Sequence, residues 1–118
     1  MKQTTWKISG IYLLALSLLL VCSTASAQIT IKTFNAKWNE ANNVSWVHDL
    51  TDVKTISYID VGKNSDAQKE YKIAVVPTII IFKDGDEVAR FQADLSFKMV
   101  ATREEVQEEI DELLMEDF

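Results

Sequence analysis

Three side chains near the middle of the chain are of types that can bind a metal ion. They are His48, Asp49 and Asp52, and a helix would place His48 and Asp52 on one face because they are four residues apart. Structural metal sites commonly need four ligands, and the sequence identifies no fourth. It also identifies no serine or cysteine nucleophile to pair with His48. We interpret the three residues as a solvated helix end, and predict no metal and no cofactor.

Two asparagines form the second group of side chains that could take part in a reaction or in binding. Asn39 and Asn42 are three residues apart in the segment 38–42, which reads Trp-Asn-Glu-Ala-Asn. An asparagine side chain donates and accepts hydrogen bonds, but it is neutral and has no redox state. Thiol–disulfide exchange would need an attacking thiolate and a second, resolving thiol. The chain has one cysteine, Cys22, so we predict no catalytic residue here.

Residues 1–27 have the organisation of a secretory signal peptide. Two lysines precede an apolar stretch at 11–21, and Ala-Ser-Ala follows at 25–27. The apolar stretch is shorter than the roughly 20 residues that cross a bilayer. We therefore expect cleavage before Gln28, a domain at 28–118, and a periplasmic or secreted protein of a bacterial envelope.

Cys22 allows one alternative to simple cleavage. The residues before it weakly resemble a lipobox, although Val21 stands where a small residue is usual, and lipidation would tether the chain to a membrane. Cleavage after Ala27 would instead remove Cys22, and the remaining domain would contain no thiol. Such a domain could neither form a disulfide nor pass one on.

The expected domain is small and acidic. Removing residues 1–27 from 118 leaves 91 residues, enough for one hydrophobic core. Of the 12 basic residues 10 remain, against 18 acidic ones, so the net charge falls to about −8. Nucleic acid and anionic lipid surfaces both require basic patches, so we predict neither as a partner.

The hydrophobic pattern predicts four strands and three helices, which position the histidine, aspartate and asparagine side chains described above. Alternating or continuous apolar residues indicate strands at 29–35, 55–60, 77–83 and 86–92. Apolar residues at helical spacing indicate one short helix within 40–50, a second starting at the N-cap Ser65, and a third starting at the N-cap Thr102. Asp84-Gly85 predicts a tight hairpin between the last two strands.

This order, β-α-β-α-β-β-α, predicts an α/β fold. Sequential β-α-β units cross over right-handed, and the final hairpin is antiparallel, so the sheet should be mixed and four-stranded with helices on both faces. Pro77 fits the start of its strand because proline cannot donate a ladder hydrogen bond.

The segment 71–91 resembles the thioredoxin family. Tyr-x-Ile-x-x-Val-Pro-Thr, an apolar strand and Phe-Lys-Asp-Gly follow one another there, and Phe34-Asn-Ala-Lys-Trp38 is similar to the segment before the family's first cysteine. The resemblance covers nearly all of 29–115. It implies a minimal thioredoxin-like fold without the additional N-terminal strand and helix, and a cis peptide bond between Val76 and Pro77.

The chain departs from the family at the residues that carry its chemistry. Asn39 and Asn42 stand where the resemblance places the two cysteines of the Cys-x-x-Cys motif, and Thr33 stands where thioredoxins bury an aspartate. A buried carboxylate is costly unless it serves a reaction, so Thr33 is consistent with the loss of the cysteines. We expect a redox-inactive protein that is not an enzyme.

Without the cysteines, the family resemblance still implies a groove beside the cis-proline. Thioredoxins hold an extended peptide there against the residue before the proline. We expect non-covalent binding of a peptide or partner protein there. The candidate groove residues are Trp38, Asn39, Ala41, Asn42, Val76, Pro77 and Thr78. Two alternatives stay open: a thiol–disulfide oxidoreductase that acts in redox homeostasis, and a purely structural domain whose groove is unoccupied.

Overall fold

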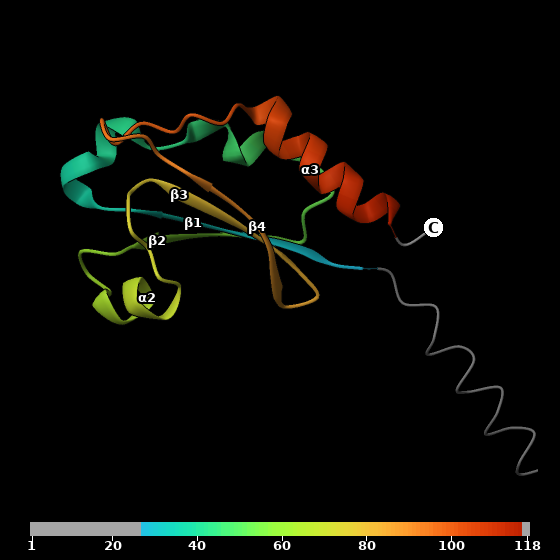
Figure 1. The fold of residues 1–118 in the computed structure, drawn as a ribbon, viewed down its shortest axis with the longest axis horizontal. Coiled ribbons are helices and arrows are strands. Elements are labelled where there is room, and N and C mark those ends of the chain that lie inside the picture. The colour runs from blue at the N-terminus through green and yellow to red at the C-terminus, as the bar shows by residue number, and fades with distance from the viewer. Residues whose placement is uncertain (1–26, 117–118) are drawn as a thin grey trace, which may run out of the picture.

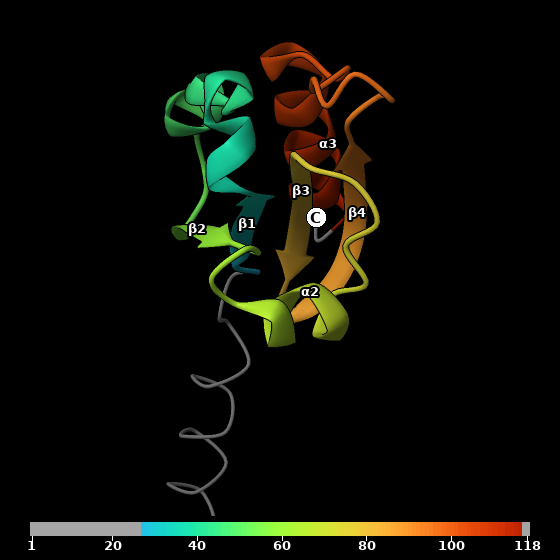
Figure 2. The same ribbon diagram turned by 90° about the vertical axis from the view of Figure 1, so that its left-hand side faces the viewer.

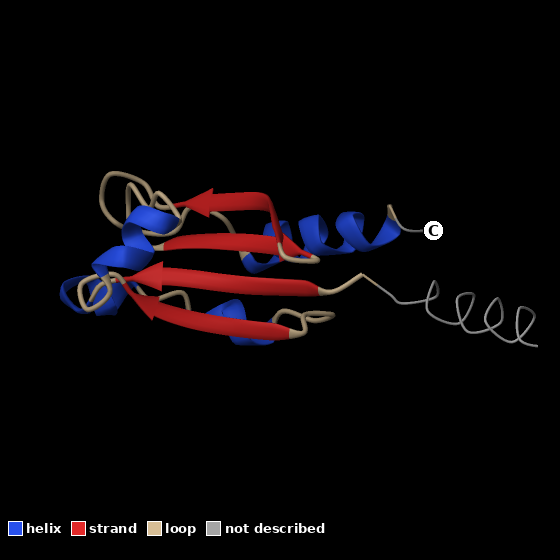
Figure 3. Cartoon of the chain, turned by 90° about the horizontal axis from the view of Figure 1, so that it is seen from below, coloured by secondary structure: helices blue, strands red, loops and turns tan. Residues whose placement is uncertain are grey.

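The computed structural model describes residues 27–116 as one four-stranded sheet with helices on both faces (Figure 1). The strands are β1 (Ile29–Asn35), β2 (Thr55–Asp60), β3 (Thr78–Lys83) and β4 (Asp86–Gln92). They lie in the order β2-β1-β3-β4, as Figure 3 shows side by side. β1 pairs parallel with β2 and antiparallel with β3, so the sheet is mixed as the sequence predicted.

The two central strands carry the core because helices cover them on both sides. Side chains alternate between the faces of a strand, so Ile79 and Ile81 point to one face while Ile80 and Phe82 point to the other. All four are buried, which explains why β3 is apolar and shows no alternation between Thr78 and Lys83.

One face of the sheet packs against the C-terminal helix α3 (Arg103–Met115) and the 3-10 helix η2 (Ser45–Asp49). Val106, Ile110 and Leu113 of α3 form the buried stripe that their spacing predicted. The Thr102 hydroxyl accepts a hydrogen bond from the Glu105 backbone N–H at 3.2 Å, so Thr102 is the N-cap of this helix.

The opposite face is covered by the short helix α2 (Ser65–Glu70) and the segment that follows it (Figure 2). The core on this side consists of Phe34, Ala36, Val61, Ile73, Val76, Ile80 and Phe82. Tyr71 packs against it, with its ring centre 5.2 Å from that of Phe34. Each face of the sheet therefore has its own hydrophobic cluster.

The four predicted strands and their hairpin are confirmed, with β3 starting at Thr78 one residue after the predicted start. Asp84 and Gly85 both have positive φ, 52° and 91°, and Lys83 pairs with Asp86 across them. Two-residue hairpin turns of this kind require positive φ at both central residues, and Asp-Gly is a favoured pair for them.

The prediction of a single helix within 40–50 was wrong. The chain forms two 3-10 helices instead, η1 (Lys37–Asn42) and η2, separated by Asn43 and Val44, whose backbone angles are not helical. Asn39 within η1 departs from helical angles with φ of −114° and ψ of 20°. Asparagine side chains compete for local hydrogen bonds, which disfavours a continuous helix.

The predicted N-cap of α2 was also wrong by one residue. Asn64, not Ser65, precedes the helix, and its side-chain oxygen accepts from the Ala67 backbone N–H at 3.1 Å. Asparagine and serine are both favoured at the N-cap, so the residue type alone does not decide between the two positions.

The expected signal peptide at 1–27 and the alternative of lipidation at Cys22 fall almost wholly outside the described residues. From 27 to 116, none of the helices has the length and apolar character that a bilayer crossing requires.

Candidate functional site

The candidate site lies where β1 and β2 end beside each other and the chain leaves the sheet in opposite directions. After β1 the chain enters η1 toward the face covered by α3, and after β2 it turns toward α2 on the other face (Figure 1). Crevices form at such points because the two connections separate beyond the carboxyl ends of the parallel strands.

A turn ending in proline lies against this crevice. The peptide bond between Val76 and Pro77 is cis, and Pro77 is fully buried. The Thr78 hydroxyl donates to the Val75 carbonyl at 2.7 Å, and the Pro77 carbonyl accepts from the Ala93 backbone N–H at 3.0 Å. The turn is thus tied both to its own strand and to the loop after β4.

Beside this turn is a small apolar pocket of about 200 Å³, which we call the proline groove. Its lining comprises Ala36, Trp38, Val61, Gly62, Gln68, Ile73, Ala74, Val75, Val76 and Phe97. Trp38 is 69% exposed and Phe97 40% exposed, and their rings meet edge to face with centres 5.0 Å apart. Two exposed aromatic side chains therefore form one wall of the groove.

The structure distributes the seven candidate groove residues over four environments. Trp38 and Val76 line the proline groove, and Ala41 is exposed outside its lining. Pro77 and Thr78 are buried beneath it. The remaining two, Asn39 and Asn42, contact each other instead of the groove space.

The asparagines form a connected set of amide hydrogen bonds. Asn39 is 5% exposed, and its side-chain oxygen accepts from Asn42 Nδ2 at 2.8 Å. Its Nδ2 lies 3.1 Å from Asn35 Oδ1, 3.1 Å from the Phe97 carbonyl oxygen and 3.4 Å from the Val76 carbonyl oxygen. Asn35 also donates to the side chain of Asn43. The set links η1 to the proline turn and to the loop after β4.

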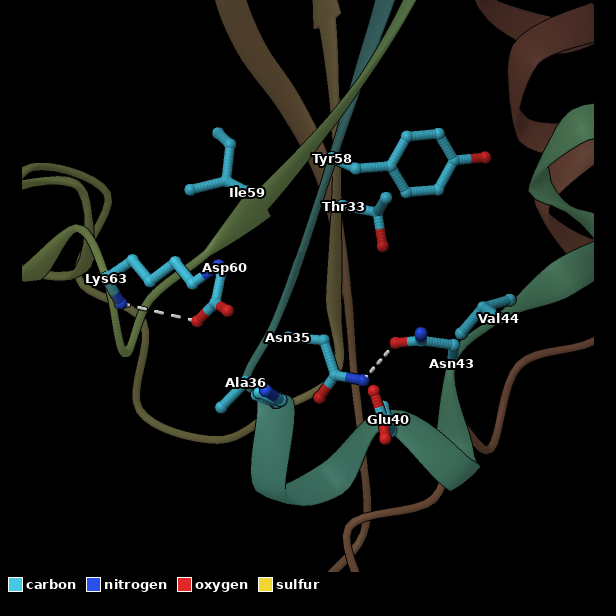
Figure 4. Close-up of a pocket in the computed structure, with 11 residues that line it drawn as sticks. Thr33, Asn35, Ala36, Glu40, Asn43, Val44, Tyr58, Ile59, Asp60 and Lys63 are labelled. Carbon is cyan, nitrogen blue, oxygen red and sulfur yellow. Dashed lines mark hydrogen bonds between the residues drawn. The ribbon is translucent and has the colours of Figure 1, made fainter.

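A second, more polar cleft of about 370 Å³ lies on the other side of Ala36, which lines both spaces. Figure 4 shows the hydrogen bond from Asn35 to Asn43 on one side of this cleft and the side chain of Thr33 above it. Thr33, which stands where the family resemblance places an aspartate, is buried with 6% of its surface exposed. The Asp60 carboxylate on the opposite side accepts from the Gly62 backbone N–H at 2.8 Å.

The three side chains considered as metal ligands do not converge. Asp52 lies beyond the end of η2 with a positive φ of 63°, and the His48 ring lies against Tyr58. The Tyr58 hydroxyl is 3.0 Å from His48 Nε2, and partial burial raises the pKa of this phenol. Within residues 27–116 no three histidine, cysteine, aspartate or glutamate side chains are grouped to hold a metal.

Two residues of the site were not among the sequence candidates. Phe97 was not singled out from the sequence, and Asn35 appeared only within the segment that resembles the family. Phe97 reaches the site through a contact with Asn39 across 58 positions, whereas Asn35 bonds to Asn39 and Asn43, four and eight positions away. An unusual density of asparagines at 35, 39, 42 and 43 was the available signal.

Comparison with known proteins identifies the architecture. The thioredoxin family model matches residues 31–105. A variant of the Halobacterium salinarum thioredoxin superposes with a TM-score of 0.57 at 22% identity, over 74% of this chain and 75% of that one. A designed protein superposes with a TM-score of 0.58 at 26% identity, over 78% of this chain and 86% of that one.

A shorter match links the chain to a curated relative. A 36-residue segment is 47% identical to the thioredoxin of Chlamydia pneumoniae, covering 30% of this chain and 35% of that protein. The segment therefore spans about a third of that relative's length. The family model, in contrast, covers more than half of the present chain, and the superposed structures share its fold. The chain belongs to the thioredoxin family.

Proposed function

We propose that this protein binds an extended peptide or a segment of a partner protein non-covalently in the proline groove, and does not exchange disulfides. The observation that carries the proposal is the pairing of an exposed apolar groove with amides at positions 39 and 42. The groove offers a binding surface, whereas the amides supply no thiolate to attack a disulfide.

The shape of the proline groove suits an extended chain with an apolar side chain. Aromatic residues contribute strongly to binding because they bury a large area with few rotatable bonds. Trp38 and Phe97 hold their rings at 5.0 Å before any ligand arrives, so little side-chain ordering would remain to be done on binding.

The backbone beside the groove can add hydrogen bonds of the strand type. A carbonyl oxygen has two lone pairs, and that of Val76 accepts a long bond of 3.4 Å from Asn39. We infer that it can also accept from the N–H of a peptide lying along the turn. Main-chain bonds would then supply affinity while the aromatic wall selects an apolar side chain.

The chemistry of the side chains at the site supports the proposal that the protein does not exchange disulfides. The exchange requires a thiolate to attack and a thiol to resolve the mixed disulfide. The one cysteine of the chain is Cys22, far in sequence from the proline groove. We therefore propose a protein of the thioredoxin family that is not an oxidoreductase.

We further propose that the protein works in the bacterial envelope, either in the periplasm or after secretion. The proposal is supported by the composition of residues 1–27, in which lysines precede an apolar stretch and a small-residue cleavage site. Fractionation of cells and N-terminal sequencing of the purified protein test it. An amino terminus at Gln28 is expected, and an unprocessed cytoplasmic protein would contradict it.

Peptide binding can be tested with the insulin B chain after its cysteines have been alkylated, which gives an unfolded, apolar probe without thiols. Saturable binding by calorimetry is expected for the wild-type protein, and its loss is expected for Trp38→Ala. Tyr58→Ala is the matched control because Tyr58 is also an exposed aromatic, at 54%, but lines the polar cleft. Equal binding by Trp38→Ala and wild type would exclude the proline groove.

The same protein should be tested for reduction of unmodified insulin with dithiothreitol as the electron source. Precipitation of reduced insulin at the uncatalysed rate is expected. A rate above that of a boiled sample would establish the oxidoreductase alternative instead. If neither assay gives a signal, the protein has the purely structural role.

A further inference from the structure

The side chain of Asn39 joins three segments that build the proline groove. It lies within η1, next to Trp38, and bonds to carbonyl groups of the proline turn and of the loop after β4. These partners, Val76 and Phe97, are 37 and 58 positions away in the sequence. A bond network of this reach positions tertiary elements, whereas a helix cap would satisfy groups in the same turn.

The chemistry of these contacts requires a donor at Asn39. Its Nδ2 carries two hydrogens and faces three oxygens, those of Asn35, Val76 and Phe97. The bond to Val76, at 3.4 Å, is the longest and therefore the weakest of the three. An aspartate of the same shape would have no hydrogen to donate, and alanine would leave the oxygens without this partner.

The Phe97 loop, which we define as residues 93–98, has few other ties to the rest of the molecule. Inside the loop, the Asp94 carboxylate accepts from the backbone N–H groups of Ser96 and Lys98 at 2.8 and 3.2 Å. Its outer residue Leu95 is 95% exposed, and Phe97 has a positive φ of 62°. Outside the loop, Ala93 bonds to Pro77 and Phe97 bonds to Asn39.

Asn39 therefore ties the backbone of Phe97 to η1 at the place where the Phe97 ring meets Trp38. We propose that Asn39 is a positioning residue that holds the Phe97 loop and the Val76 carbonyl in the arrangement that binds a peptide. This inference rests on the proposed function, since it names how the proline groove is kept ready. The asparagine that stands where the family resemblance places a cysteine thus holds the two walls of the groove together.

Two variants test the role of the amide. Asn39→Asp keeps the shape of the side chain but removes its donors at neutral pH, and Asn39→Ala removes the side chain. Asn64→Ala is the matched control, because it also removes an asparagine that makes a structural hydrogen bond, at the start of α2. All three variants are compared at a temperature at which each is folded.

Two readouts separate positioning from general stability. The first is hydrogen exchange of the Phe97 and Lys98 amides, with the Trp38 indole resonance, measured by NMR. The second is affinity for the alkylated insulin B chain. We expect both Asn39 variants to exchange faster in the loop, to shift the indole resonance, and to bind on the order of tenfold more weakly, as for a lost hydrogen bond. Asn64→Ala should leave both readouts unchanged.

Each possible result decides something. If wild type does not bind the probe, but Asn39→Asp still releases the Phe97 loop, peptide binding is refuted and the positioning role stands. If wild type binds and both Asn39 variants bind equally well, the positioning role is refuted and peptide binding stands. If hydrogen exchange in the Phe97 loop and the Trp38 indole resonance are unchanged in Asn39→Asp, the positioning role is refuted as well, whatever the affinity for the probe.

Discussion

At positions 39 and 42 two amides meet where the family resemblance places two thiols. The Asn42 amide donates to Asn39 at 2.8 Å, so the two side chains are in direct contact. Contact between the side chains is also what a disulfide between these positions would need. Side chains at positions 39 and 42 are therefore close enough to touch, and in this chain their contact is a hydrogen bond.

A double variant tests whether the rest of the site can still support thiol chemistry. Asn39→Cys with Asn42→Cys should form an intramolecular disulfide and reduce insulin above the uncatalysed rate. Activity should stay low because Thr33 cannot relay a proton as the family's buried aspartate does. Turbidity of precipitating insulin and thiol titration measure the two properties.

The single variant Asn39→Cys is the control, since it has no resolving thiol in the site and should not turn over. The double variant should also lose stability, because Asn39 makes several hydrogen bonds worth about 1 kcal/mol each. A double variant that stays fully reduced under air would show that contact between the amides does not imply contact between sulfurs.

At the scale of single elements, the start of α3 depends on one hydroxyl. Thr102→Ala should lower the free energy of unfolding by about 1 kcal/mol, because the Glu105 N–H loses its side-chain partner. Urea denaturation measures the change. Thr51→Ala, at an exposed threonine outside any helix, is the control and should change stability by less than about 0.5 kcal/mol. Equal effects of the two variants would contradict the cap.

The Phe97 loop should respond to acid. Hydrogen bonds from the Ser96 hydroxyl and from the backbone N–H groups of Lys98 and Ser96 lower the pKa of Asp94 below its ordinary 3.8. A lowered pKa in the folded chain means that the carboxylate stabilises the loop above the ordinary pKa. This stabilisation is lost as pH falls through the lowered value.

Protection factors of the Ser96, Phe97 and Lys98 amides, which correct for the pH dependence of intrinsic exchange, should therefore fall below about pH 4, while those of β3 should not. Asp94→Asn is the comparison, because its side chain can still accept hydrogen bonds but does not titrate. The acid response of the loop should be absent in this variant. A loop that opens equally in both proteins over this pH range would assign the transition to other carboxylates.

The sequence predicted regular elements well where one local signal dominates. Asp84-Gly85 has few alternatives to a tight hairpin, and the stripe behind Thr102 specifies both the start and the buried face of α3. It failed at 40–50, where Val44, Val47 and Leu50 have helical spacing but Asn39 before them bonds to a distant segment. Periodicity reports which residues are buried and does not determine the backbone between them.

The candidate site was predictable only in part, for a related reason. Trp38, Val76 and Pro77 follow from a local motif, whereas Phe97 reaches the site through the conformation of a loop with few sequence signals. The role of Asn39 depends on carbonyl groups 37 and 58 positions away. Contacts of this separation arise from tertiary folding, so a reading of local spacing identifies the residue without its partners.

At the scale of the whole molecule, two hydrophobic clusters share the central strands of one sheet. Adjacent residues of β3 belong to different clusters, Ile80 facing α2 and Ile81 facing α3, and both are completely buried. Neither cluster can lose β3 without exposing the other. We infer that the faces stabilise each other and that the described domain unfolds as one unit.

Ile80→Ala and Ile81→Ala test this coupling. Each should lower the free energy of unfolding by about 2–5 kcal/mol, a large part of the roughly 5–15 kcal/mol available to a domain, because each leaves a cavity in a packed core. Far- and near-ultraviolet circular dichroism should give coincident urea transitions in both variants. Val88→Ala, at a side chain of β4 that is 40% exposed, should have little effect. If Ile80→Ala loosened only the α2 side, and the α3 side unfolded at a higher urea concentration, the clusters would be independent and the sheet would not couple its two faces.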